Sequence, residues 1–301
     1  MSGENGSFVD RMGSLMFDIE HGLDIYSSNS CWLTSSLIYD DDYVDQLRSF
    51  SSHFHIYFIG RVPSLVVNDI SEEGDCFVYF ADFGGRKKEF RVNKPEGFSL
   101  KNIDGRYFMS SENGDVFDLP MPNSLPFEVL YVGQSYGDEG SRDVFDRLRR
   151  HETLQKISIL EKKDNYEIVV CAVEIAAGNR VITVMNPFAK NSDDSDSRIE
   201  NGFSKLYNTS EIERVSLYEA SMIRYFRPEY NEKFKDSFPS TNHKVLRDCY
   251  EKDFSSVSAS FSYDDVPFEM FSSVVGAGKQ HLAQYNLHKD EDRKAFFMMG
   301  G

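Results

Sequence analysis

The sequence has few of the residues that define several large classes of protein. Only four of its 301 residues are cysteine, and they lie far apart without a CxxC pair, which indicates reduced thiols and disfavours a zinc site. No apolar run reaches the roughly 18 residues of a membrane span. The amino-terminal MSGENGSFVD lacks the basic start and the apolar stretch of a signal peptide. We therefore expect a cytoplasmic protein that does not contact a membrane.

Positive charge is also scarce. The chain has 33 lysine and arginine residues against 49 aspartate and glutamate residues, a formal net charge of -16. Non-specific affinity for nucleic acid comes mostly from neutralising phosphates, so this composition argues against a general polyanion binder. A protein of this charge that acts on nucleic acid needs a local basic patch, a metal ion or a partner.

Several secondary structure elements can be predicted from the chain. Short β-branched and aromatic runs between residues 54 and 92 predict strands. The continuous apolar run at residues 166–176 predicts a strand that is buried on both faces. Ser210 and Glu213 form a capping-box pattern that starts a helix, which Pro228 ends. Further strands are predicted within residues 254–275, and a helix within residues 281–297.

The stretch LYVGQSYGDEGSRDVFDRLRRH, residues 130–151, combines a strand end with a basic helix. A helix that begins near Ser141 puts Arg147 and His151 one turn apart on the same side. Taken alone, each feature has an ordinary structural reading. The arginines form a solvated face paired with nearby acids, and the histidine is a partly buried structural residue. Glu219, within the apolar stripe of the later helix, lies either at the edge of that stripe or in a cleft.

Together these features resemble the GIY-YIG nuclease domain. The resemblance rests on the strand ending Tyr131-Val-Gly133, the spacing of Arg147 and His151, the inward Glu219, and the Pro-Glu-Tyr-Asn sequence at 228–231. It covers roughly residues 104–240 and includes the family's element order β, β, α, β, α. It implies an α+β fold with three parts: a β-rich N-terminal region (1–95), a GIY-YIG-like β-β-α-β-α domain (96–240) and a C-terminal extension (241–301).

The resemblance also implies a role for each matching residue. Tyr131 positions or deprotonates the attacking water, Arg147 stabilises charge on the phosphate, and Glu219 holds Mg²⁺ or Mn²⁺. His151 belongs to the same catalytic cluster. Phosphodiester cleavage needs charge neutralisation, a Lewis acid and an oriented water. One carboxylate with phosphate oxygens and waters is an ordinary magnesium environment.

The substrate-binding residues implied in the same way are Arg149, Arg150 and Asn231. The first motif of the family departs from the pattern, because its Gly-x-Tyr strand normally lies a short hairpin before the second. Tyr107, in Gly-Arg-Tyr, has the right letters but is distant in sequence from Tyr131, whereas the nearer segment has Phe117 instead of a tyrosine. Tyr107 is the candidate for the first catalytic hydroxyl, and Phe117 at that place would remove it.

Two functions follow from these observations. The first is a magnesium-dependent endonuclease that hydrolyses phosphodiester bonds of DNA or RNA. Like-sign repulsion then keeps the enzyme off bulk nucleic acid until a protein partner or a particular structure engages it. The second is a catalytically inactive GIY-YIG-like scaffold that binds a partner protein. The position of the first tyrosine distinguishes the two.

Overall fold

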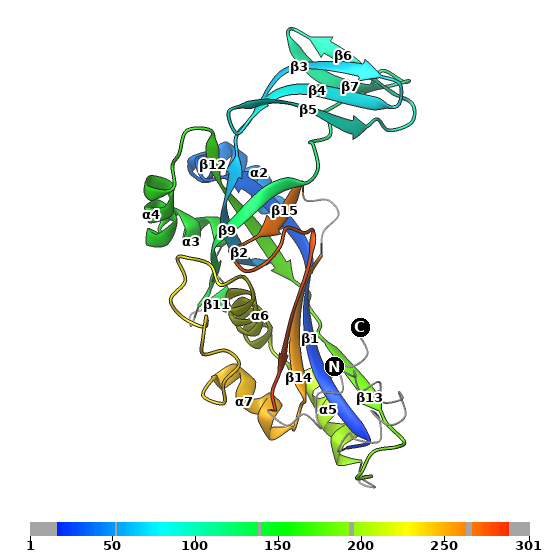
Figure 1. Ribbon diagram of the computed structural model, residues 1–301, viewed down its shortest axis with the longest axis vertical. Helices are drawn as coiled ribbons and strands as arrows, with labels where there is room; N and C mark the ends of the chain where they lie inside the picture. Colours follow the sequence, from blue (N-terminus) through cyan, green and yellow to red (C-terminus); the bar gives the residue numbers. More distant parts are fainter. Residues whose placement is uncertain are drawn as a thin grey trace, which may run out of the picture.

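The chain folds into a mixed α+β structure built on one large curled sheet (Figure 1). The computed structural model describes residues 17–51, 53–137, 140–141, 143–192, 196–262 and 267–288. Helices cover parts of both faces of the sheet, and a small all-β unit projects from one end (Figure 1). The molecule is therefore elongated.

The large sheet has eight strands and mixes both ends of the chain. Its order is β15-β9-β2-β12-β1-β14-β16, and β13 also pairs with β1. β12 and β13 pair one after the other with the same edge of the long strand β1, and both are antiparallel to it. β14 pairs with β1 in parallel. The bounds are β1 (Ile19–Thr34), β2 (Phe54–Pro63), β9 (Leu125–Gln134), β12 (Tyr166–Ile175), β13 (Arg180–Met185), β14 (Ser256–Ser262), β15 (Phe268–Phe271) and β16 (Gln280–Asn286).

The small all-β unit is an insertion between β2 and β9. It consists of two three-stranded sheets, β3-β4-β5 and β6-β7-β8, with a small core of its own around Phe77 and Tyr79. β2 and β9 pair antiparallel on either side of it, with Arg61 opposite Glu128. The bounds are β3 (Leu65–Glu73), β4 (Cys76–Phe83), β5 (Arg86–Asn93), β6 (Phe98–Ile103), β7 (Arg106–Ser111) and β8 (Val116–Phe117). β2 and β9 are thus the two arms of one hairpin with a very long connection.

The centre of the large sheet is buried on both faces. Alternate residues of β12 enter two cores: Val169, Cys171 and Val173 face one, and Ile168, Val170 and Ala172 face the other. Helices α6 and α7 cover the first face, and η1, α2, α3 and α4 cover the second; α5 packs on β13 and β1. The bounds are η1 (Leu37–Tyr39), α2 (Asp41–Ser51), α3 (Val144–Arg149), α4 (Glu152–Leu160), α5 (Ser197–Asn208), α6 (Glu211–Phe226) and α7 (Lys244–Glu251).

Several predicted elements are confirmed. The run at residues 166–176 is a strand buried on both faces, and Ser210 with Glu213 forms a complete capping box at the start of α6. The prediction of one helix from Ser141 is wrong, because the chain forms two short helices. The Asp143 side chain caps the first, and His151 caps the second.

The predicted helix within residues 281–297 is also wrong where the structure describes it. Residues 281–286 lie in β16, which pairs antiparallel with β14, and alternate residues such as His281 and Ala283 are buried. Pairing with the free edge of β14 and burial of alternate side chains stabilise a strand here more than the local helix propensity stabilises a helix. Residues 289–301 lie outside the described part of the chain.

The predicted domain boundaries do not coincide with breaks in the structure. β1 and β2, from the region 1–95, pair with β12 and β9 of the region 96–240. β14 and β15, from the region 241–301, pair with β1 and β9. The insertion between β2 and β9 forms two separate sheets, and β10 (Tyr136–Gly137) pairs with β11 (Gly140–Ser141) in a short sheet of its own. The large sheet crosses the predicted boundaries because strands distant in sequence supply most of its neighbours.

Two features follow the composition. The cysteines Cys31, Cys76, Cys171 and Cys249 are free thiols. None of the helices in the described ranges combines the length and apolarity that a bilayer crossing requires.

The insertion is expected to be dispensable for the large sheet. Because β2 and β9 end beside each other, an Asn-Gly turn can replace residues 66–123 and close the hairpin directly. We expect this variant to keep a cooperative thermal transition and the circular dichroism of a mixed α+β protein. A transition that becomes gradual would show that the large sheet depends on the insertion.

Candidate active site

Two tyrosines from β2 and β9 form the centre of the site. Tyr57 lies opposite Gly133 in the strand pair, and Tyr131 lies opposite Ile59. Their rings are stacked, with centroids 6.3 Å apart and planes 25° apart. Tyr57 is fully buried, whereas Tyr131 is partly exposed and lines a cleft. The antiparallel pairing therefore brings two hydroxyl groups from distant parts of the sequence together.

Gly133 provides the space for this pair of rings. A Cβ atom at this position would lie 2.6 Å from Cε1 of Tyr131 and 2.8 Å from the hydroxyl oxygen of Tyr57. Both distances are below van der Waals contact, so any side chain at residue 133 would displace one or both rings. The glycine of the Tyr-Val-Gly sequence is needed here for close approach.

His151 packs its ring against both tyrosines. The ring centroids lie 5.5 Å from Tyr57 and 5.1 Å from Tyr131. Its Nδ1 accepts a hydrogen bond from the backbone N–H of Leu154 at 3.1 Å, which fixes the neutral tautomer with the proton on Nε2. Burial and then the nearby charge of Arg147 lower the pKa of His151 to about 4. His151 is thus a neutral positioning residue at pH 7, with no free lone pair for a general base.

Arg147 brings a positive charge to the tyrosine pair. It projects from α3, and its charge opposes the burial that raises the pKa of Tyr57 and of Tyr131. Its side chain is exposed and forms no ion pair with any described residue, although acidic residues are in large excess. The neighbouring acids Asp143 and Asp146 pair instead with Arg48, at 3.4 and 2.7 Å.

The two other arginines of this segment have different positions. Arg149 donates from Nε to the carbonyl oxygen of Ile38 at 2.7 Å and pairs with Asp41 at 2.8 Å. It fixes η1 and α2 against α3, so the substrate-binding role predicted for Arg149 is corrected to a structural one. Arg150 is the exposed C-cap residue of α3, and it does not line the cleft.

Glu219 reaches the cleft from α6, on the other side of β9. Its carboxylate receives no hydrogen bond from the described residues. Burial raises its pKa from 4.5 to about 7, and the charges of Lys233 and Arg147 only partly oppose this effect. A carboxylate that is shielded from water and has no hydrogen-bond donor destabilises the folded protein when no ligand is bound. The position in a cleft, which was one of two readings of the sequence, is the one observed.

Asn231 holds the free edge of β9. Its side chain accepts from the backbone N–H of Val132 at 2.9 Å and donates to the carbonyl oxygen of the same residue at 2.8 Å. The backbone N–H of Tyr230 also donates to the carbonyl oxygen of Leu130. Both polar ends of the buried Asn231 amide are therefore in use. Asn231 thus positions the loop after α6 and also lines the cleft, and its role in substrate binding stays a prediction.

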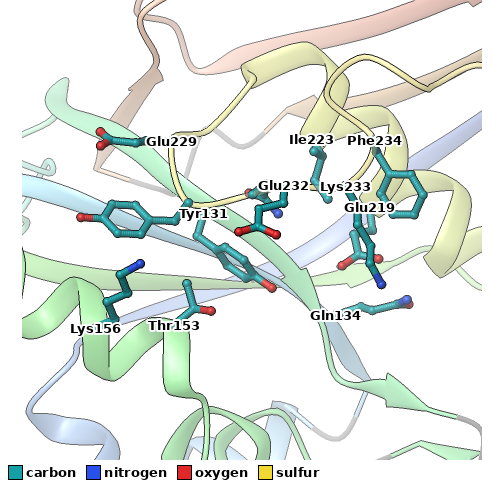
Figure 2. Close-up of a pocket in the computed structure, with 12 residues that line it drawn as sticks. Tyr131, Gln134, Thr153, Lys156, Glu219, Ile223, Glu229, Glu232, Lys233 and Phe234 are labelled. Atoms are coloured by element: carbon teal, nitrogen blue, oxygen red, sulfur yellow. The ribbon is translucent and has the colours of Figure 1, made fainter.

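Of these residues, Tyr131, Glu219 and Asn231 line a cleft of about 700 Å³ between β9, α4 and the loop after α6 (Figure 2). Figure 2 shows the Tyr131 ring across the middle of the cleft, with Glu219, Lys233 and Gln134 on one side and Lys156 on the other. The lining residues are Tyr131, Gln134, Thr153, Lys156, Glu219, Ile223, Glu229, Tyr230, Asn231, Glu232, Lys233 and Phe234. Lysines thus face the cleft from two of its walls.

Neither candidate for the first tyrosine reaches this cleft. Tyr107 lies in the inserted unit, where its hydroxyl donates to Asp69 at 2.6 Å. Phe117 is an exposed residue of β8 in the same unit. The catalytic role predicted for Tyr107 is therefore corrected, and Tyr57 occupies the place beside Tyr131. The sequence contained one indication of this, a tyrosine in the apolar strand HIYFIG.

The comparisons with known proteins add no further assignment. No family model, no curated protein and no solved structure matches the chain. Within the described ranges, no group of three or more His, Cys, Asp or Glu side chains is arranged to hold a metal ion. Any cation in the cleft would therefore be held by fewer than three such side chains of the described residues, together with other kinds of oxygen ligand.

Replacing Glu219 by glutamine is expected to stabilise the protein at alkaline pH. The folded state holds the Glu219 proton more tightly than the unfolded state, so stability falls as the pH rises from 4.5 to about 7. Each pKa unit corresponds to about 1.4 kcal/mol, which sets an upper bound of about 3 kcal/mol for the gain at pH 8.5. Thermal unfolding of Glu219→Gln and wild type at pH 8.5 and pH 4.5 measures it.

The difference should shrink at pH 4.5, where wild-type Glu219 is itself protonated. Glu229→Gln, which changes an exposed carboxylate of the same cleft, serves as the control and should leave stability nearly unchanged. A Glu219→Gln protein that is less stable than wild type at both pH values would mean that the carboxylate has a structural partner.

Proposed function

We propose that the protein is a metal-dependent endonuclease that hydrolyses phosphodiester bonds through a GIY-YIG-like site. The observation that carries the proposal is the proximity of four groups, Tyr57, Tyr131, Arg147 and Glu219, of which Tyr131 and Glu219 line one cleft. They come from β2, β9, α3 and α6, which are distant in sequence. Packing alone gives no reason to gather two hydroxyls, a cation without a carboxylate partner among the described residues, and a carboxylate without a hydrogen-bond donor among them.

The element order supports the same proposal. β2, β9, α3, β12 and α6 occur in the order β, β, α, β, α of the family that the sequence resembles. Further elements lie between them: β3 to β8 after β2, β10 and β11 after β9, α4 after α3, and β13 and α5 after β12. The inserted unit lies inside the hairpin that carries the two tyrosines, which accounts for their unusual distance in the sequence. With Tyr57 as the first tyrosine, the pattern needs no missing hydroxyl, and the main argument for an inactive scaffold is removed.

Arg147 is suited to contact the phosphate. Its guanidinium is exposed, has no carboxylate partner among the described residues, and lies beside the Tyr57 hydroxyl. A phosphate oxygen can therefore accept hydrogen bonds from Arg147 without breaking an existing ion pair. Such donors stabilise the charge that develops on the non-bridging oxygens.

The tyrosine hydroxyls are suited to orient the attacking water. Burial raises the pKa of both Tyr57 and Tyr131, so both are protonated at neutral pH in the free protein. Each hydroxyl can donate one hydrogen bond and accept another. The His151 ring and the absence of a side chain at Gly133 hold the pair in place.

The chemistry of Glu219 fits a divalent cation. Mg²⁺ and Mn²⁺ take oxygen ligands and are commonly held by one or two carboxylates together with water and substrate phosphates. The carboxylate faces a cleft, has no donor among the described residues, and is destabilised by burial until a positive charge arrives. When bound there, a divalent ion would act as the Lewis acid for the leaving or non-bridging oxygens.

The charge of the protein bears on how nucleic acid, DNA or RNA, is engaged. The cleft has Lys156, Lys233 and the nearby Arg147, but also the exposed acids Glu229 and Glu232. With a net charge of -16, we propose that productive binding relies on a protein partner or on a particular nucleic-acid structure.

Cleavage is expected to require Tyr57 and Arg147. It should not require Tyr107 or Arg150, which are residues of the same types away from the cluster. Tyr57→Phe and Arg147→Ala should each lower cleavage roughly 100-fold or more, the usual effect of removing one transition-state contact. The matched controls Tyr107→Phe and Arg150→Ala should cleave like wild type. The assay uses single-stranded DNA, duplex DNA and RNA with Mg²⁺ or Mn²⁺ against a chelator.

Equal losses in Tyr57→Phe and Tyr107→Phe would contradict the assignment of the first tyrosine. No metal-dependent cleavage of any substrate by the wild-type protein would favour the inactive scaffold that binds a partner.

A further inference from the structure

Gln134, the last residue of β9, has a buried polar atom without a partner. Its side-chain Oε1 is shielded from solvent and forms no hydrogen bond with any residue in the described ranges. Buried amide oxygens are nearly always paired, because leaving one unpaired forfeits its hydration without replacement. Several other described side chains also have such an atom, but Gln134 is the one among them that lines the cleft, where a ligand could reach it.

This oxygen belongs to the same cleft as Glu219. Both residues line it, and Figure 2 draws Gln134, Glu219 and Lys233 in one corner. The Glu219 carboxylate likewise has no donor among the described residues. Lys233 lowers the pKa of Glu219 through its charge but forms no ion pair with it in the described structure. Two kinds of oxygen acceptor without donors thus lie in one corner of the cleft.

The oxygen atoms of Gln134 and Glu219 determine which kind of ligand can bind between them. An anion would be repelled by the Glu219 carboxylate, and an apolar group would leave the oxygens of both side chains unsatisfied. A hard divalent cation accepts a carboxylate and an amide oxygen together and fills its remaining positions with water. A neutral second ligand also leaves the cation with net positive charge, which favours the approach of a phosphate.

We propose that Oε1 of Gln134 is a second protein ligand, beside Glu219, for the divalent cation of this cleft. The inference rests on the proposed function, because the cation is the one that cleavage requires. Gln134 is suited to this task by its place on a paired strand: it lies opposite Ile56 and directly after Gly133. The ligand is therefore carried by the same strand as Tyr131.

The test is Mn²⁺ binding to the full chain without nucleic acid, measured by electron paramagnetic resonance. Gln134→Met keeps the length of the side chain and removes the amide. We expect its affinity for Mn²⁺ to fall at least about tenfold, as is usual when a group that supports a metal is lost. Gln284→Met, at an exposed position of β16, is the matched control and should bind like wild type. Glu219→Gln marks complete loss of the site.

Unchanged Mn²⁺ affinity in Gln134→Met would overturn the inference and leave cleavage through Glu219 intact. If wild type shows no Mn²⁺ binding that depends on Glu219, the inference is also overturned. The cleavage assay with metal and chelator tests the proposed nuclease activity separately. Should Gln134→Met fail to fold by circular dichroism, Gln134→Glu replaces it. That variant retains an oxygen ligand and should bind Mn²⁺ at least as tightly as wild type, and a loss of affinity in it would reject the inference.

Discussion

The antiparallel pairing of β2 with β9 is the constraint on which the site depends. It places Tyr57 beside Tyr131, and Gly133 leaves just enough room for the two rings. His151 packs on both rings while it caps α4, so the position of the helices on this face is tied to the tyrosines. A shift of the pairing by one residue would turn one ring to the opposite face of the sheet. Fold and site therefore share one register.

On the other side of β9, the loop after α6 completes the cleft. β15 pairs only with the first part of β9, and Asn231 satisfies the backbone of Val132 beyond it. This contact brings α6 and its Glu219 to the free edge of the strand. Asn231, which was predicted from the sequence to bind substrate, thus positions the wall of the cleft that carries Glu219. We expect replacement of Asn231 to disturb the site by displacing Lys233 and Glu219.

The sequence predicted the local elements better than their assembly. The capping box at Ser210 and the apolar strand at residues 166–176 are short-range signals, and both are confirmed. Arg147 and Glu219 were singled out by spacing, and the structure brings both to the tyrosines. Tyr57 was missed because a complete two-sheet unit interrupts its hairpin, and no local pattern shows which strands pair across such an insertion. Arg149 was misassigned because its partners, Ile38 and Asp41, lie far upstream.

The central claim is that a phosphodiester binds where Arg147 meets the tyrosine pair. The most direct test is a crystal structure of the Glu219→Gln protein with a bound oligonucleotide. The account requires a backbone phosphate in hydrogen-bond contact with Arg147 and with the hydroxyl of Tyr57 or Tyr131. A phosphate bound elsewhere on the protein, with this cluster untouched, would contradict it.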